Sequence, residues 1–155
     1  MTPTVSEHHP ALGIDYGEAR IGIAATDPSG ILAHPVESIH LAATEPLARI
    51  GALVRQKSIR TLVLGLPVRL DGTEGTAAAK VRLFGDRLHT AFPEIPLLYV
   101  DEFLTTATAQ EKLRQAGKKA KNQRPVIDQA AAVEILNNWM ETLEGPASWT
   151  LPPDL

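Results

Sequence analysis

Asp15 stands where a charged side chain is unexpected in this 155-residue chain, at the end of the apolar run over residues 11–15. A carboxylate buried there without a partner would be very costly, so it must be paired with a cation, bound to a metal or open to water. Gly17 follows it closely. A glycine beside an acid leaves space for a phosphate or a hydrated metal ion to approach the backbone.

Asp128 is a second unexpected acid, because it lies on the apolar face of a helix expected near the end of the chain. Ala131, Ala132, Ile135 and Trp139 follow it at helical spacing and form the buried stripe of that helix. An acid near a helix start also favours the positive end of the helix dipole, so this position alone has a purely structural interpretation.

Asp101 and Glu102 follow the apolar run over residues 95–100, at the carboxyl edge where open α/β sheets bind their ligands. Successive residues of a strand point to opposite faces, so only one of the two acids can join a cluster with the others. The pattern of residues does not decide which one, and the other would cap the helix that follows.

Acids from three separate segments predict a metal site if the fold brings them together. Like charges repel, and Mg²⁺ or Mn²⁺ neutralises them while keeping several waters for substrate phosphates. Two such ions about 3.5 to 4 Å apart catalyse phosphodiester hydrolysis by activating water and stabilising the leaving oxygen. We therefore expect a divalent-metal-dependent hydrolase that cleaves phosphodiester bonds.

The elements that must position these acids follow an α/β pattern. Short apolar runs joined by turns predict an antiparallel meander, and helices then alternate with buried strands. We expect a mixed five-stranded sheet, with three antiparallel strands followed by two parallel ones and helices on both faces. The expected strands cover residues 11–15, 21–26, 31–39, 61–66 and 95–100, and the expected helices cover about 44–57, 76–92, 106–116 and 125–145.

The composition fits one domain. With 44% hydrophobic residues the chain can build a substantial core, which we assign to residues 11–145, after a mobile leader at 1–10 and before an irregular tail at 146–155. No apolar run approaches the roughly 20 residues of a membrane-spanning helix. The absence of cysteine and of a secretory signal predicts a cytoplasmic protein without a membrane partner.

The net charge of −3 is unusual for a protein that binds nucleic acid, because such proteins commonly carry a basic surplus. A local positive run partly answers this objection, since Lys118, Lys119, Lys121 and Arg124 fall within seven residues. A short run of this kind is often only a solvated loop. Beside a metal site, these four residues and Arg20 would be the contacts to substrate phosphates.

Four ordered motifs resemble those of the YqgF/RuvX family, whose members are described as Holliday-junction resolvases and as ribosomal-RNA maturation nucleases. The resemblance covers residues 12–139. Its motifs are Gly13-Ile-Asp-Tyr-Gly with Arg20-Ile-Gly-Ile-Ala-Ala, Gly65-Leu-Pro followed by Asp71-Gly, Asp101-Glu with Leu104-Thr-Thr, and Val126-Ile-Asp with Ala130-Ala-Ala.

The resemblance implies a ribonuclease-H-like fold in which Asp15, Glu102 and Asp128 are the catalytic, metal-binding acids, and so it selects Glu102 over Asp101. It implies Mg²⁺ or Mn²⁺ as the cofactor and structured RNA or branched DNA as the partner. The oligomeric state, monomer or homodimer, stays open. The chain departs from the family at Phe103, where arginine is usual, and this removes a cation beside the expected site.

Two alternatives remain. Phe103 and the negative net charge favour a non-catalytic nucleic-acid-binding module of the same fold, which cleavage assays would reveal. The sequence Asp15-Tyr-Gly followed by Gly22 also resembles the phosphate loop of actin-like ATPases. One small domain offers no second lobe to close over ATP, so length argues against that class.

Overall fold

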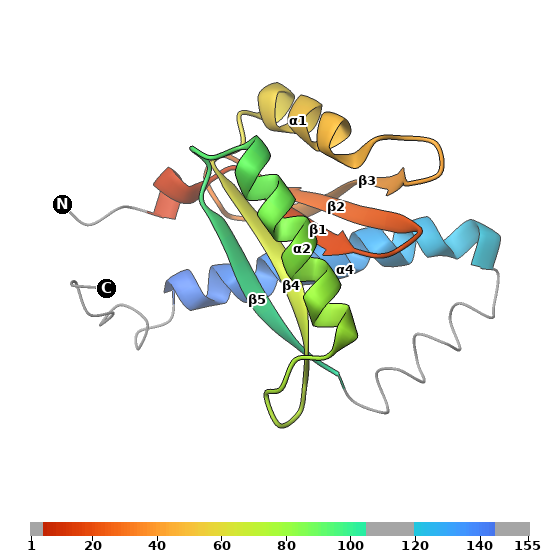
Figure 1. Ribbon diagram of the computed structural model, residues 1–155. Helices are drawn as coiled ribbons and strands as arrows, with labels where there is room; N and C mark the ends of the chain where they lie inside the picture. The colour runs from red at the N-terminus through yellow and green to blue at the C-terminus, as the bar shows by residue number, and fades with distance from the viewer. Residues whose placement is uncertain (1–4, 105–119, 145–155) are drawn as a thin grey trace.

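The computed structural model describes residues 5–104 and 120–144 of the chain (Figure 1). These residues form five strands, two helices of ordinary length, one long C-terminal helix and a short 3-10 helix at the start. The elements are η1 (Val5–His8), β1 (Ala11–Tyr16), β2 (Arg20–Thr26), β3 (Ala33–His40), α1 (Pro46–Lys57), β4 (Thr61–Arg69), α2 (Thr76–Ala91), β5 (Leu97–Leu104) and α4 (Ala120–Glu144).

The strands form one mixed sheet in the order β3-β2-β1-β4-β5. β2 pairs antiparallel with both β1 and β3, while β4 lies parallel to β1 and β5 lies parallel to β4. This confirms the expected five-stranded sheet with three antiparallel and two parallel strands. Because β1, β4 and β5 run in the same direction, their carboxyl ends meet at one edge of the sheet.

Helices cover both faces of the sheet (Figure 1). On one face, Ile50 of α1 and Phe84 of α2 pack against strand residues such as Ile14. On the other, Ile135 of α4 packs against residues such as Val63. Alternation along each strand decides which residues face which helix, and it also fixes the face on which each acid lies.

The parallel strands β4 and β5 are longer than expected. β4 continues to Arg69 and β5 to Leu104, and the two remain paired through Pro67 with Glu102 and Arg69 with Leu104. The expectation that Asp101-Glu102 ends its strand is therefore corrected. The reason is that the extension of β4 supplies the backbone partner that keeps β5 extended beyond Val100.

The turn between β2 and β3 is a hairpin, as expected, but β3 begins at Ala33 rather than at residue 31. The Gly30 amide donates to the Asp27 carbonyl at 3.0 Å, and the Ile31 amide donates to the Asp27 carboxylate at 2.8 Å. The Ile31 amide is the main reason that the pKa of Asp27 is lowered. This side chain fixes the turn beyond Gly30 and delays the start of the strand.

The expected mobile leader over residues 1–10 differs from the structure in its second half. Val5–His8 forms the 3-10 helix, and His9 is only 2% exposed. The His9 Nδ1 lies 2.6 Å from the Thr26 hydroxyl oxygen, and the His9 ring packs against Trp139 of α4 at 5.2 Å between ring centres. His9, just before β1, is thus packed against the sheet and the last turns of α4.

The last helix begins earlier than expected. Proline is compatible with a first helical turn, so the sequence predicted a start at Pro125, but α4 already begins at Ala120. The expected helix over residues 106–116 and the expected tail over residues 146–155 lie outside the described residues. Within residues 5–104 and 120–144, every helix is too short or too polar to cross a membrane.

Glu37 of β3 holds α1 onto the sheet through a bidentate ion pair with Arg49, whose Nε and Nη2 donate at 2.8 and 2.6 Å. The hydrogen bond from Arg49 lowers the pKa of Glu37, so this contribution to stability exists above the unfolded pKa and is lost as the pH falls through the folded one. We expect Glu37→Gln to lower the free energy of unfolding by roughly 0.5 to 1 kcal/mol at neutral pH.

The same substitution should have almost no effect once acid has protonated Glu37 in the folded protein. Urea denaturation of both proteins at neutral and at acidic pH measures the difference. Arg49→Gln should show the same pH dependence, because it removes the other partner. An equal loss at both pH values would contradict the assignment.

Candidate metal centre

Asp15 lies on the α4 face of the sheet, near the carboxyl end of β1. Its neighbour Ile14 is buried in the core on the α1 and α2 face, so Asp15 points to the opposite side. Gly22 of β2 is its direct partner across the antiparallel pair. On the other side, Gly65 of β4 follows Leu64, the partner of Ile14. The Asp15 carboxylate is therefore flanked on both neighbouring strands by glycine.

The space above each glycine is filled by another candidate acid. A β-carbon at Gly22 would overlap the backbone carbonyl of Asp128 on α4, and a β-carbon at Gly65 would overlap the carboxylate of Glu102 and the side chain of Ile135. Neighbouring strands are about 4.8 Å apart. Asp128 thus lies over the strand on one side of Asp15, and the Glu102 carboxylate lies over the strand on the other.

The choice between Asp101 and Glu102, which the pattern of residues left open, has a geometric answer. Val100 packs into the core beneath α4, and Glu102, two residues further along β5, faces the same side. Asp101 is exposed on the opposite face, where its charge is one of the causes that raise the pKa of Arg82, after the hydrogen bond to Glu74. Of these two acids, Glu102 is the one that shares a face with Asp15 and Asp128.

Arg20 supplies a cation to this group of acids. Its Nε donates a hydrogen bond of 2.9 Å to Oδ2 of Asp128, with both side chains a little over one-fifth exposed. The sequence predicted Arg20 as a phosphate contact and did not connect it with Asp128, which lies 108 residues away. A guanidinium has five donors, so this bond leaves others that can still reach a phosphate.

The residues present suit a hard divalent ion. All three candidate ligands are carboxylates, and glycine at positions 22 and 65 lets Asp128 and Glu102 lie close over the strands beside Asp15. Among the residues that the structure describes, no group of three or more His, Asp or Glu side chains is already close enough to hold a metal. Mg²⁺ commonly binds one or two carboxylates, waters and substrate phosphates, so an all-protein cage is not required. Arg20 engages Oδ2 of Asp128, so Oδ1 is the oxygen with which Asp128 would bind an ion.

The loop after β4 is ordered by its own side chains. The Asp71 carboxylate accepts the Thr73 hydroxyl at 2.7 Å and the Thr73 amide at 2.9 Å, and these two bonds are the main reason that the pKa of Asp71 is lowered. Arg69 donates to the Thr73 hydroxyl at 3.1 Å. The Asp71-Gly motif therefore shapes the loop at the carboxyl edge, and Gly72 has a positive φ of 85° there.

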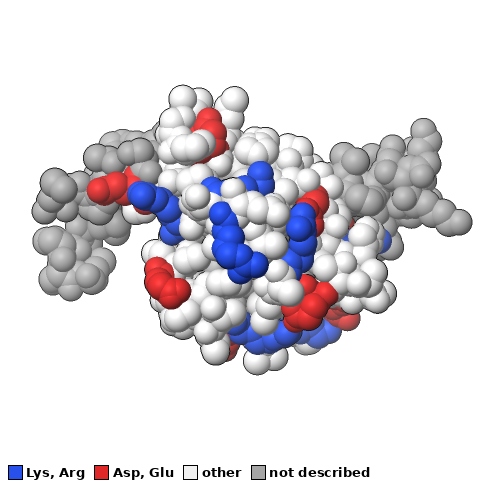
Figure 2. All heavy atoms as spheres, turned by 90° about the horizontal axis from the view of Figure 1, so that it is seen from above, with Lys and Arg blue, Asp and Glu red and all other residues white. Residues whose placement is uncertain are grey.

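The expected basic run is only partly within the described residues. Lys118 and Lys119 lie outside them, and Lys121 and Arg124 belong to the first turns of α4, where the structure describes the backbone alone. Seen from the side of α1, basic and acidic side chains are interspersed over the surface (Figure 2). The described residues of that face therefore form no continuous positive surface for a polyanion.

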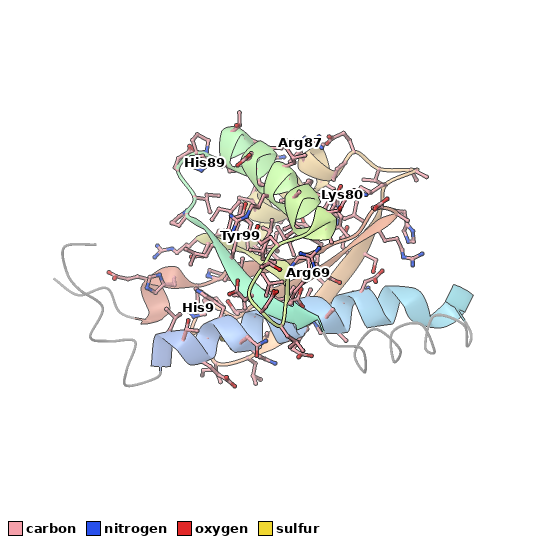
Figure 3. The ribbon with its side chains drawn as sticks, turned by 60° about the horizontal axis from the view of Figure 1, so that its bottom comes forward. His9, Arg69, Lys80, Arg87, His89 and Tyr99 are labelled. Carbon is pink, nitrogen blue, oxygen red and sulfur yellow. The ribbon has the colours of Figure 1, made fainter. Side chains whose placement is uncertain are left out.

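Sequence reasoning missed two cations near the site. Arg69 is the last residue of β4, and Lys80 lies in the second turn of α2 (Figure 3). Both elements meet at the carboxyl edge of the sheet, where ligands of open α/β sheets bind. That rule, applied to the end of the strand over residues 61–66 and to the helix after it, could have identified them.

The family described as "RuvX: Holliday junction resolvase" matches residues 9–142. A relative from Cutibacterium acnes is 48% identical over 130 residues, covering 84% of this chain and 81% of its own length. One from Streptomyces avermitilis is 47% identical over 133 residues, covering 84% and 85%. Both carry the name "Putative pre-16S rRNA nuclease".

A solved structure shares the fold. The chain is similar to RuvC of T. thermophilus, solved in complex with a Holliday junction substrate, with a TM-score of 0.54 and 15% sequence identity. The match covers 89% of this chain and 97% of the RuvC chain. At this identity the likeness concerns the fold, which is ribonuclease-H-like as expected.

Proposed function

The chain belongs to the RuvX family of Holliday junction resolvases, and from this premise we propose that it is a divalent-metal-dependent endonuclease that hydrolyses phosphodiester bonds in structured nucleic acid. The observation that carries the proposal is the placement of Asp15, Glu102 and Asp128 on one face of the sheet, with glycine on both sides of Asp15.

Asp15, Glu102 and Asp128 are the residues that would hold Mg²⁺ or Mn²⁺. When bound, such an ion activates water for attack on the phosphodiester and neutralises the charge that develops on the leaving oxygen. Asp15 is central, because it lies between the two other acids. Arg20 keeps the Asp128 carboxylate oriented through its hydrogen bond of 2.9 Å and is close enough to the acids to contact a substrate phosphate as well.

The names of the relatives and of the family support the proposed substrate class. Relatives at 43 to 48% identity carry a name that refers to precursor 16S ribosomal RNA, and this favours structured RNA in the cytoplasm as the substrate. The family description and the RuvC complex favour a branched DNA as the second candidate. Lys118, Lys119, Lys121 and Arg124 are proposed as phosphate contacts that offset the net charge of −3.

A cleavage panel tests the proposal. We expect the purified protein to cleave a fragment of precursor 16S ribosomal RNA in the presence of Mg²⁺ or Mn²⁺, and we expect a chelator to abolish this cleavage. A four-way DNA junction and an unstructured oligonucleotide of matched length are assayed in parallel, with products resolved on denaturing gels.

Each outcome of the panel has a distinct meaning. Cleavage of the DNA junction alone would move the substrate from RNA to DNA and keep the metal-dependent mechanism. If the protein binds a structured substrate but does not cleave it in the presence of Mg²⁺ or Mn²⁺, the nuclease proposal is contradicted and the non-catalytic module is supported. Cleavage that persists in the chelator would contradict metal dependence.

A further inference from the structure

A cavity of about 200 Å³ opens near the candidate metal centre. None of the residues to which a role was assigned above lines it. Its walls come from three places at the carboxyl edge of the sheet: the turn after β1, the end of β4 and the first turns of α2. The residues lining it are Tyr16, Gly17, Glu18, Pro67, Ala77, Lys80 and Val81.

The cavity and the acids lie on opposite sides of the same strand end. Tyr16 directly follows Asp15 in β1, so the two side chains point to opposite faces of the sheet. Tyr16 faces α2, where its ring packs on the ring of Phe84 with 4.7 Å between centres and 30° between planes. A nucleic-acid strand that crosses this edge can therefore place one nucleotide at the acids and a neighbouring nucleotide in the cavity.

The lining is suited to a flat apolar group with a negative charge attached. Tyr16, Pro67 and Val81 provide an aromatic and two aliphatic surfaces. Packing on Phe84 holds the Tyr16 ring in one orientation. Aromatic side chains of this kind stack nucleobases without regard to their identity, and each stacked base strengthens binding.

Lys80 provides the positive charge at the rim of the cavity (Figure 3). In the structure its ammonium group is paired with the carboxylate of Glu18, and the two side chains are 45% and 74% exposed. An ion pair so open to solvent contributes little to stability. A phosphate can thus replace Glu18 as the partner of Lys80 at little cost.

We propose that this cavity binds one nucleotide of the substrate strand adjacent to the phosphodiester held at the acids. The base lies against Tyr16, the phosphate contacts Lys80, and Glu18 competes with that phosphate for the ammonium group. This inference rests on the proposed function, because it assumes a nucleic-acid substrate. It adds a subsite on the face of the sheet away from the metal-binding acids.

Two substitutions with opposite expected effects test the proposal. Lys80→Gln should weaken binding of a fluorescent RNA hairpin with a single-stranded tail by about fivefold, since one phosphate contact is lost, and should lower the salt dependence by roughly 0.7 to 0.9 in log–log slope. Glu18→Gln should tighten binding by up to about fivefold, because it removes the competitor for Lys80. Fluorescence anisotropy in a chelator measures both without cleavage.

Arg87 offers a matched control on the same helix. It is also a solvent-exposed cation paired with a glutamate, Glu45, at 3.6 Å, but it does not line the cavity. Arg87→Gln should therefore leave the affinity for the hairpin within about twofold of the unsubstituted protein, apart from the general loss of one positive charge.

A second pair of variants tests the cavity by its volume. Ala77 lines it and Ala79 does not, and both are exposed residues of α2 that tolerate leucine in a helix. Ala77→Leu should fill the cavity and weaken binding by about fivefold or more through the loss of one stacked base, whereas Ala79→Leu should not. Thermal unfolding of both variants checks that α2 is intact.

The outcomes separate this proposal from the one on which it rests. If the unsubstituted protein binds the hairpin and the Lys80 and Glu18 variants change affinity in the same direction or not at all, the cavity is not a nucleotide site, and the metal-dependent function stands. If Ala77→Leu and Ala79→Leu bind equally well, the same conclusion follows. If the unsubstituted protein binds no structured nucleic acid, both proposals fail together.

Discussion

Asp15→Asn is expected to reduce metal-dependent cleavage by at least about a thousandfold, which corresponds to roughly 4 kcal/mol of the activation barrier. An amide keeps the size of the side chain but removes the negative charge that a divalent ion requires. Because Asp15 lies between strands that carry glycine at the neighbouring positions, no other side chain of β2 or β4 can take its place there.

The fold should survive this substitution. Asp15 is at the end of β1 and only half-buried, so asparagine can keep the backbone pairing with Gly22. Cleavage rates, the thermal unfolding midpoint and calorimetric titration with Mn²⁺ are measured on the same preparation. Full activity in Asp15→Asn, or unchanged Mn²⁺ binding, would contradict the assignment of this acid as a ligand.

Glu102→Gln and Asp101→Asn should differ by about a hundredfold in cleavage rate, although they alter adjacent residues. Glu102 lies on the α4 face with its carboxylate over Gly65, whereas Asp101 is exposed on the opposite face. Glu102→Gln should therefore lose at least about 99% of the activity, and Asp101→Asn should keep most of it.

This pair is a control for local damage to β5. Each substitution exchanges a carboxylate for the matching amide within the same extended strand, so the backbone pairing with β4 is unchanged. Initial rates at saturating metal and at several metal concentrations distinguish a loss of turnover from weaker metal binding. A greater loss in Asp101→Asn than in Glu102→Gln would show that the reactive face of the strand has been assigned incorrectly.

Much of the fold could be predicted from the sequence because it depends on local patterns. Alternating apolar runs, the turn at Asp27-Pro28-Ser29-Gly30 and the proline at the start of α1 each report short-range preferences. The lengths of β4 and β5 could not be predicted in this way. Pro67 and the acids after Val100 each predict the end of a strand. Pairing between β4 and β5 keeps both strands extended beyond these residues.

The candidate site was predictable in its residue types and not in its contacts. The acids at positions 15, 101, 102 and 128 predicted the site from their unexpected places in the sequence. The side of the sheet to which Glu102 points depends on the register of β5 against β4, which the sequence does not contain. The pairing of Arg20 with Asp128 joins residues 108 positions apart, and the burial of His9 depends on Trp139 at the far end of the chain. No local pattern contains that information.

The glycines at 13, 22 and 65 have a mechanical consequence. A methyl group at any of them would overlap α4 or the Glu102 side chain, which packs on the same face. At Gly13 and Gly22 the overlap includes main-chain carbonyls of α4, so at these points the helix rests on the sheet as one backbone upon another. Backbone atoms cannot change rotamer as side chains do. The helix therefore cannot shift along the sheet or rotate without losing its contacts at both glycines. This close backbone contact fixes the distance of Asp128 on α4 from Asp15 and Glu102 on the sheet.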